Sequence, residues 1–249
     1  MNHIVQNRLS LRQITSSIWV KEQPFKYFGL EVGTRMTIVR LLHNQLVLIS
    51  PVKLDSQTIT EINDLGTVTY IIAPNLFHYL YLQDCKNIYP DASLITAPGL
   101  ETKTKINSDL VFTKNEISFN GELEYFLFAG FQAFMLTTLS IANEIVFYHP
   151  ESKTLILTDT AFHFDRSFPL ITQFASRIIS CYERLRPSIL DKIAIQDKEQ
   201  ITASVTKLLQ WDFQRVIMAH GTIVEENAKE RLVAGYEWFL DTNLTAIEK

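Results

Sequence analysis

Three residues whose side chains can bind metal each follow a short apolar segment of the sequence. The segments are Ile71-Ile72-Ala73 before His78, Leu155-Ile156-Leu157 before Asp159, and Val216-Ile217-Met218-Ala219 before His220. Each segment reads as a buried strand, so the three side chains are predicted near the C-terminal ends of strands. Open α/β sheets place ligands at that edge. The sequence therefore predicts a ligand site built from strand ends.

The elements that would position these residues alternate between strands and helices. Apolar and β-branched stretches predict strands over 17–20, 36–42, 46–50, 68–72, 93–97, 110–112, 123–128, 144–148, 154–158 and 215–219. Helical periodicity predicts helices over 55–65, 76–87, 167–185, 197–211 and 224–240. Asp55 or Ser56 is expected to cap the start of the first helix and Gly66 to end it. This order is that of an α/β protein with two sheets.

Composition excludes several classes of protein. The chain has 249 residues, of which 47% are hydrophobic and 20% charged, and its formal net charge is −4. These values support a sizeable hydrophobic core. The sequence contains no Lys/Arg run that would indicate nucleic-acid binding. Residues 1–8 lack the pattern of a signal peptide, and no apolar stretch approaches the ~20 residues that span a bilayer. We therefore expect a cytoplasmic protein without a membrane segment, in which Cys85 and Cys181 are free core thiols.

In their order along the chain, the three strand ends resemble the metallo-β-lactamase superfamily, which includes ribonuclease Z and hydroxyacylglutathione hydrolase. That superfamily has a strand followed by His-x-His-x-Asp-His and a helix, then a strand ending in Asp, and later a strand ending in His-Gly. A branch of it, defined as a domain of unknown function, is similar at Gly33-Thr34-Arg35-Met36-Thr37, Ala73-Pro74-Asn75 with His78, Asn143-Glu144 and Leu157-Thr158-Asp159. The resemblance covers most of the chain. It implies a single domain over 1–249 with a four-layer αββα sandwich.

The resemblance also implies a degenerate metal motif. The final His of the four-ligand motif falls on His78, and its other members fall on Ala73, Asn75 and Phe77. The bridging Asp falls on Asp159, the late His on His220, and the mid-chain His near Ser140. The tri-histidine half of the dinuclear centre is therefore lost, and the other half keeps two imidazoles and one carboxylate. Such a set suits one zinc, iron or manganese ion.

Each candidate residue also has a purely structural interpretation. His78 could be a helix-start histidine bonded to backbone, Asp159 a carboxylate that caps a turn, and His220 part of a packing turn with Gly221. Asn75 could bond a ligand or serve as a turn residue after Pro74.

Other polar residues near these segments are expected to be structural. His163 and Asp165 follow Asp159 in the same loop and could replace missing ligands, but we expect them to be solvated loop residues. His43 and His149 are expected to be exposed in turns. Glu144 opens a predicted buried strand and therefore needs a partner, for which Arg35 is the candidate.

Three functions remain open. The first is a metallo-β-lactamase-like protein that binds a small molecule through Asn75, His78, Asp159 and His220 and is not a conventional dinuclear hydrolase. The second is a mononuclear hydrolase of an ester, thioester or phosphoester, with one metal ion on His78, Asp159 and His220. The third is a non-catalytic protein-interaction module. The sequence predicts neither substrate nor oligomeric state.

Overall fold

The structure is a computed structural model that describes residues 10–112, 118–135, 138–141, 143–195 and 197–244. Residues 1–8, which entered the expectation about a signal peptide, lie outside the described residues. Internal contacts divide the chain into two compact units. The first comprises Met1–Phe25 and Gly33–Glu124, and the second comprises Lys26–Val32 and Tyr125–Lys249. The single domain over 1–249 stays a prediction.

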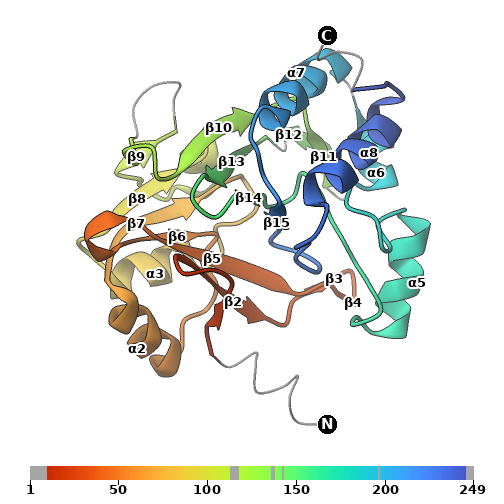
Figure 1. Ribbon diagram of the computed structural model, residues 1–249. Coiled ribbons are helices and arrows are strands. Elements are labelled where there is room, and N and C mark those ends of the chain that lie inside the picture. Colours follow the sequence, from red (N-terminus) through yellow and green to blue (C-terminus); the bar gives the residue numbers. More distant parts are fainter. Residues whose placement is uncertain (1–9, 113–117, 136–137, 142, 196, 245–249) are drawn as a thin grey trace. The chain divides into compact units, whose positions relative to one another are not determined.

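The first unit is built on a mixed seven-stranded sheet (Figure 1). Its strands in spatial order are β1 (Arg12–Gln13), β2 (Ile18–Gln23), β5 (Thr34–Arg40), β6 (Gln45–Ile49), β7 (Thr67–Ala73), β8 (Ser93–Thr96) and β9 (Leu110–Val111). Pairing is antiparallel from β1 to β6 and parallel from β6 to β9. The C-terminal ends of β6, β7 and β8 therefore lie at one edge of this sheet.

Helices and turns of the first unit follow local sequence signals. The helix α2 (Ser56–Leu65) begins and ends as predicted, because Asp55 accepts a hydrogen bond from the Thr58 N–H at 2.8 Å and Gly66 ends the helix. Both α2 and α3 (Leu82–Ile88) contact β7, and α4 (Leu100–Thr104) follows β8. A 3₁₀ turn, η1 (Leu42–Asn44), joins β5 to β6 and leaves His43 exposed as predicted.

The helix predicted over 76–87 begins only at Leu82. The side-chain oxygen of Asn75 accepts hydrogen bonds from the backbone N–H groups of Phe77 and His78, both at 2.9 Å. These bonds hold the backbone in a turn where the first helical turn was expected. His78 therefore lies in a turn between β7 and α3.

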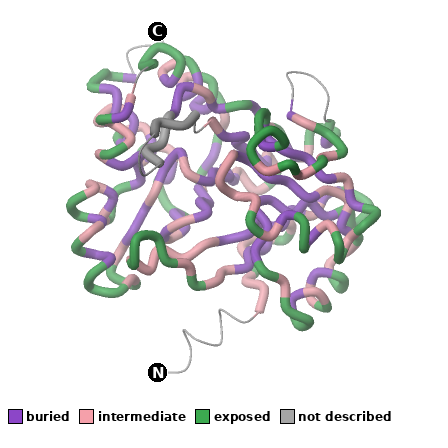
Figure 2. Tube along the Cα trace, turned by 180° about the vertical axis from the view of Figure 1, so that it is seen from behind, coloured by how far each residue is buried: buried purple, intermediate pink, exposed green. Residues whose placement is uncertain are grey.

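The second unit contains a mixed four-stranded sheet. Its spatial order is β10 (Glu124–Phe128), β13 (Glu144–His149), β14 (Thr154–Ile156) and β15 (Arg215–Ile217). The strand β14 is antiparallel to β13 and parallel to β15. Two short hairpins are formed by β3 (Lys26–Tyr27) with β4 (Leu30–Glu31) and by β11 (Gln132–Met135) with β12 (Thr138–Ile141). Much of the chain inside each unit is buried (Figure 2). Every residue of β13 is buried.

Four helices complete the second unit: α5 (Leu170–Ile178), α6 (Ile189–Ala194), α7 (Lys198–Leu209) and α8 (Ala228–Leu240). The helix α8 contacts β15 and both α6 and α7. Among the described residues, no helix has the length and apolarity that a bilayer span requires. Cys85 and Cys181 are both free and buried, as predicted.

The single helix predicted over 167–185 is replaced by the shorter α5 and a separate α6. After α5 the chain pairs with residues 162–164, because the Phe164 N–H donates to the Cys181 carbonyl at 3.0 Å and the Arg186 N–H to the Phe162 carbonyl at 3.2 Å. A capping box of Ser188 and Asp191 then begins α6. Pairing with a distant segment thus overrides the helical periodicity.

Gly235 of α8 lies against the chain at Leu185 and Arg186. A Cβ at this position would lie 2.1 Å from the Leu185 carbonyl oxygen and 2.7 Å from the Arg186 Cβ. We expect Gly235→Ala to lower the free energy of unfolding by about 1–3 kcal/mol through overpacking, although alanine is the better helix former. The exposed neighbour Ala234 provides the control, since Ala234→Gly should cost about 1 kcal/mol from helix propensity alone. Urea unfolding measures both, and a stabilised Gly235→Ala protein would contradict this packing.

Candidate functional site

His78 is held by the neighbouring strand end in the first unit. It follows β7, and Ser50 follows β6, which is parallel to β7. The Ser50 hydroxyl and Nδ1 of His78 lie 2.6 Å apart. Such a bond to one ring nitrogen fixes the orientation of the imidazole, so a metal would be bound through Nε2. Ser50 was not among the predicted site residues, although it closes an apolar strand at this edge of the sheet, which is a usable sequence signal.

The other positions of the degenerate motif have structural roles in the first unit. Asn75 is fully buried, and its side-chain oxygen holds the turn that carries His78. This geometry agrees with the turn interpretation, and contact with a ligand stays a prediction. Ala73 is a buried residue that ends β7. The ring of Phe77 lies 4.3 Å from the ammonium of Lys103.

Asp159 and His220 lie together in the second unit. They follow β14 and β15, and because these strands are parallel their C-terminal ends adjoin. Oδ1 of Asp159 and Nε2 of His220 are 3.6 Å apart. Their side chains are 23% and 14% exposed, so a small ligand or ion can reach both. The structure thus brings two of the predicted metal ligands together within one unit.

A buried carboxylate fixes the loop that carries Asp159. Glu144 at the start of β13 is fully buried and accepts hydrogen bonds from the N–H of Thr158 at 3.0 Å, the N–H of Asp159 at 2.6 Å and the hydroxyl of Thr160 at 2.7 Å. Burial raises the pKa of Glu144, and the negative charge of Asp159 raises it further, while the three hydrogen bonds act in the opposite direction.

The predicted pairing of Glu144 with Arg35 is wrong. Arg35 forms an ion pair with Glu22, at 2.6 Å, within the first unit. Glu144 is satisfied instead by the N–H and hydroxyl groups of residues 158–160. A buried carboxylate needs hydrogen-bond donors, and neighbouring backbone N–H groups serve as well as a cation does.

The turn after His220 is packed against His163. Gly221 has a left-handed φ of 91°, and a Cβ there would lie 2.2 Å from the His163 carbonyl oxygen. The same oxygen accepts a hydrogen bond from the Thr222 N–H at 2.7 Å. His163 is only 6% exposed, and its Nε2 lies 2.7 Å from a guanidinium nitrogen of Arg231. Burial lowers the pKa of His163, and the charge of Arg231 lowers it further, so the ring is neutral and accepts this bond.

Two histidines therefore differ from their predicted surroundings. His163 was expected to be solvated but is buried, because it packs under the His220 turn. His149 was expected to be exposed but is also buried, and its Nδ1 lies 2.9 Å from the Ser152 hydroxyl. Asp165 is partly buried and accepts hydrogen bonds from the N–H and the hydroxyl of Ser167.

Negative charge gathers around Asp159. Burial raises the pKa of Asp191 to about 6, and the charge of Asp159 contributes in the same direction. Burial also raises the pKa of Tyr27, and both Asp159 and Asp191 add to it. Asp159, Asp191 and Glu144 are thus three acidic side chains in one part of the second unit. A local excess of negative charge favours a cation.

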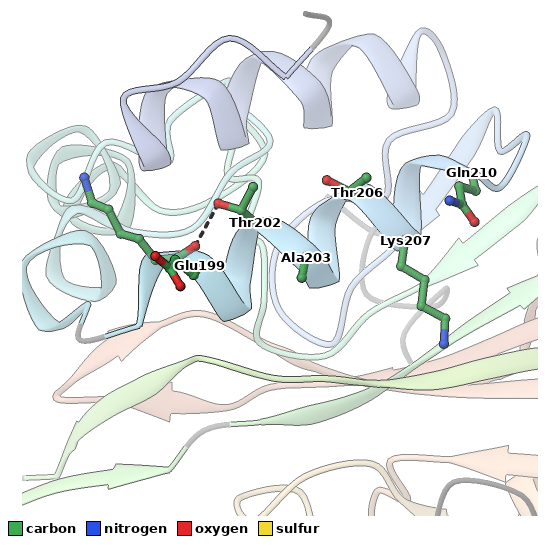
Figure 3. A pocket seen from close by; sticks show the side chains of 7 residues that line it. Glu199, Thr202, Ala203, Thr206, Lys207 and Gln210 are labelled. Atoms are coloured by element: carbon green, nitrogen blue, oxygen red, sulfur yellow. Dashed lines mark hydrogen bonds between the residues drawn. The ribbon is translucent and has the colours of Figure 1, made fainter. Parts of the chain in front are cut away.

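Two surface depressions of the second unit are lined by residues other than Asp159 and His220. One, with a volume of about 750 Å³, follows the outer face of α7 and is lined by Glu199, Thr202, Lys207 and neighbouring residues of that helix (Figure 3). Another, of about 460 Å³, lies between residues 212–214 and the start of α8. The α7 depression is lined by mostly polar residues of one helix and its C-terminal end, which gives it the character of ordinary surface.

We expect Glu144→Gln to lower the free energy of unfolding by about 1–3 kcal/mol. The amide keeps one acceptor but turns an N–H group toward the Asp159 N–H. Glu144→Ala should cost more, because it leaves three donors without an acceptor. Thr160→Val is the matched control, since it removes only one of the three donors and should cost about 1 kcal/mol. Urea denaturation ranks the variants, and a Glu144→Gln protein as stable as the parent would refute this role of the carboxylate.

The raised pKa of Asp191 predicts a pH-dependent stability. A carboxyl whose folded pKa is raised stabilises the fold below its unfolded pKa, and this contribution is lost as pH rises through the folded value, here about 6. Relative to Asp191→Asn, the parent protein should therefore lose roughly 2–3 kcal/mol between about pH 4 and 7. Relative to Asp212→Asn, the stability of the parent protein should instead rise with pH, because the bond to Lys153 lowers the pKa of Asp212. Parallel curves of unfolding free energy against pH for the parent and Asp191→Asn would exclude this effect.

Comparisons with known proteins agree with this architecture. Residues 15–187 match the family described as Domain of unknown function (DUF4336). No curated protein matches the sequence. A metallo-β-lactamase from Pontibacter korlensis is similar in structure, with a TM-score of 0.62 and 18% identity over 93% of this chain and 98% of that one.

Two further solved structures are similar. The metallo-β-lactamase FIM-1 from Pseudomonas aeruginosa, in its mono-zinc form, has a TM-score of 0.57 and 11% identity over 96% of this chain and 94% of that one. The metal-soaked Flv1 flavodiiron core from Synechocystis sp. PCC6803 has a TM-score of 0.59 and 15% identity over 93% of this chain and 60% of that one.

These likenesses confirm the predicted fold class, an α/β fold of metallo-β-lactamase type with two mixed sheets flanked by helices. The family match spans most of the chain and agrees with the branch that the sequence resembles. The chain therefore belongs to the DUF4336 family, whose fold here is of the metallo-β-lactamase type.

Proposed function

We propose that this protein holds a single divalent metal ion on His78, Asp159 and His220 and binds a small molecule at that ion. The observation that carries the proposal is the pair of Asp159 and His220, 3.6 Å apart at the ends of two parallel strands. The match of His78 to the last ligand of the superfamily motif supplies the third member.

The donor set fits such an ion. His78, Asp159 and His220 are side chains that could together hold a metal. Two imidazoles and one carboxylate bind zinc or non-haem iron in proteins, and manganese accepts the same donors. The positions of the other superfamily ligands carry Ala73 and Phe77, which have no ligand atom. A mononuclear centre therefore fits the chain better than a dinuclear one.

Residues around the three ligands would hold them in place. Ser50 orients the imidazole of His78, and Asn75 holds the turn on which His78 lies. Glu144 holds the backbone of Asp159, and the contact between Gly221 and His163 fixes the turn after His220. A bound divalent ion would act as a Lewis acid toward an oxygen of the small molecule. We assign Asn75 the positioning of His78.

Hydrolysis of an ester, thioester or phosphoester is the second candidate function. The observation that favours it is the number of protein ligands, because catalytic zinc sites use three and keep a further position for water or substrate. Asp159 and His220 are also partly exposed, which a substrate requires.

Metal binding tests the proposal directly. The protein is purified without a metal-affinity tag, its metal content is measured by elemental analysis, and zinc binding is titrated by calorimetry. We expect about one equivalent of metal, and an affinity that falls at least tenfold in Asp159→Ala, His220→Ala and His78→Ala. His43→Ala is the matched control, because His43 is an exposed histidine of η1 and should leave binding unchanged. Ser50→Ala should weaken binding about tenfold through the orientation of His78.

The outcomes separate the candidate functions. An absence of metal after incubation with zinc, iron and manganese would refute the metal centre and with it the hydrolase. Loss of metal in Asp159→Ala and His220→Ala but not in His78→Ala would remove His78 from the ligand set. If one equivalent binds, cleavage of an ester or phosphodiester that stops with chelator would establish the hydrolase. A metal-loaded protein without cleavage would leave ligand binding as the function.

A further inference from the structure

The helix α5 faces its polar side chains inward and its apolar side chains outward. Thr172, Gln173 and Ser176 are buried. The Thr172 hydroxyl donates to the Glu31 carbonyl at 3.0 Å, and the Gln173 amide donates to the Phe168 carbonyl at 2.8 Å. A surface helix ordinarily has the reverse arrangement, with its apolar stripe toward the core. Hydrogen bonds therefore attach α5 to its unit, and its apolar stripe is left for another contact.

Apolar side chains are exposed on both α5 and α6. On α5 the exposed fractions are 83% for Leu170, 65% for Ile171, 67% for Phe174 and 63% for Ile178. On α6 Leu190 is 56% exposed and Ile193 71%. The end of α5 and the start of α6 are joined, because the Ile189 N–H donates to the Ile179 carbonyl at 3.0 Å. We call these six side chains the apolar face.

The hairpin of β3 and β4 extends this surface. It contacts α5, as the bond from Thr172 to Glu31 shows, and Figure 1 draws it beside that helix. Phe28 at its tip is 72% exposed and has a left-handed φ of 47°. Monomeric proteins rarely expose contiguous apolar patches of more than a few hundred Å², and larger ones mark binding surfaces.

The exposed charges in the segment that carries α5 are mainly positive. Arg166, Arg177 and Arg184 are exposed in the segment that carries α5, where Glu183 is the exposed acidic residue. Within the residues that the structure describes, none of the three arginines forms an ion pair with a carboxylate. The chain as a whole has a net charge of −4, so this concentration of positive charge is local.

We propose that the apolar face docks onto an anionic lipid surface. Bulky aliphatic and aromatic side chains flanked by arginines are the composition of helices that lie in a membrane interface. Leu170, Phe174 and Ile178 would enter the acyl region, and the arginines would bind headgroup phosphates. A second copy of this chain fits less well, because two identical cationic faces repel each other.

Vesicle flotation tests this docking with the full chain. One set of vesicles contains phosphatidylcholine alone, and the other contains phosphatidylcholine and phosphatidylglycerol in equal amounts. We expect at least tenfold stronger binding to the anionic vesicles, decreasing as salt is added. The double variant Phe174→Ser with Ile178→Ser should bind at least tenfold more weakly. Arg177→Glu should bind about tenfold more weakly.

The matched control is Leu80→Ser. Leu80 is 66% exposed in the first unit, close to the value for Phe174, and its replacement should leave vesicle binding unchanged. All substituted side chains are exposed, so circular dichroism should report unaltered folding. Equal binding to both kinds of vesicle, or none to either, overturns the proposal. Concentration-dependent dimerisation that Phe174→Ser with Ile178→Ser abolishes, without vesicle binding, would assign the face to a second copy and also overturn it.

Discussion

The buried carboxylate of Glu144 is the constraint on which the Asp159 side of the candidate site depends. It belongs to β13, which contributes no candidate ligand, yet it accepts hydrogen bonds from three consecutive residues after β14. Without it, the chain would leave the sheet with buried N–H groups unpaired, at a cost of about 1–3 kcal/mol for each group. The direction of the Asp159 side chain therefore follows from a residue 15 positions earlier in the sequence.

In each unit, two parallel strands end side by side and so place the residues that follow them close together. The pair β6 and β7 brings Ser50 to His78, and the pair β14 and β15 brings Asp159 to His220. Loss of ligand atoms at Ala73 and Phe77 leaves this scaffold intact, because one residue is core and the other packs on a lysine. The fold and the chemistry of its site are therefore separable, and the fold alone assigns no reaction.

Those parts of the fold that depend on local signals were predictable from the sequence. Asp55 and Gly66 delimit α2 correctly, and buried apolar runs locate β7, β14 and β15. Errors arose where a distant segment or a single side chain takes over the backbone. Asn75 displaces the start of α3, and pairing with residues 162–164 ends α5 early. The burial of His149 and His163 could not be inferred from their predicted positions in a turn and a loop, because tertiary packing decides it.

The inverted orientation of α5 assigns folding and surface contact to opposite sides of one helix. Its buried polar residues form hydrogen bonds with the rest of the unit, so substitutions of these residues affect folding stability. Its exposed apolar residues contribute nothing to the core, so folding places little restriction on them. Substitutions on the outer side of α5 can therefore change what this surface binds without changing the fold. Substitutions on its inner side change the fold first, so one helix separates adaptability from stability.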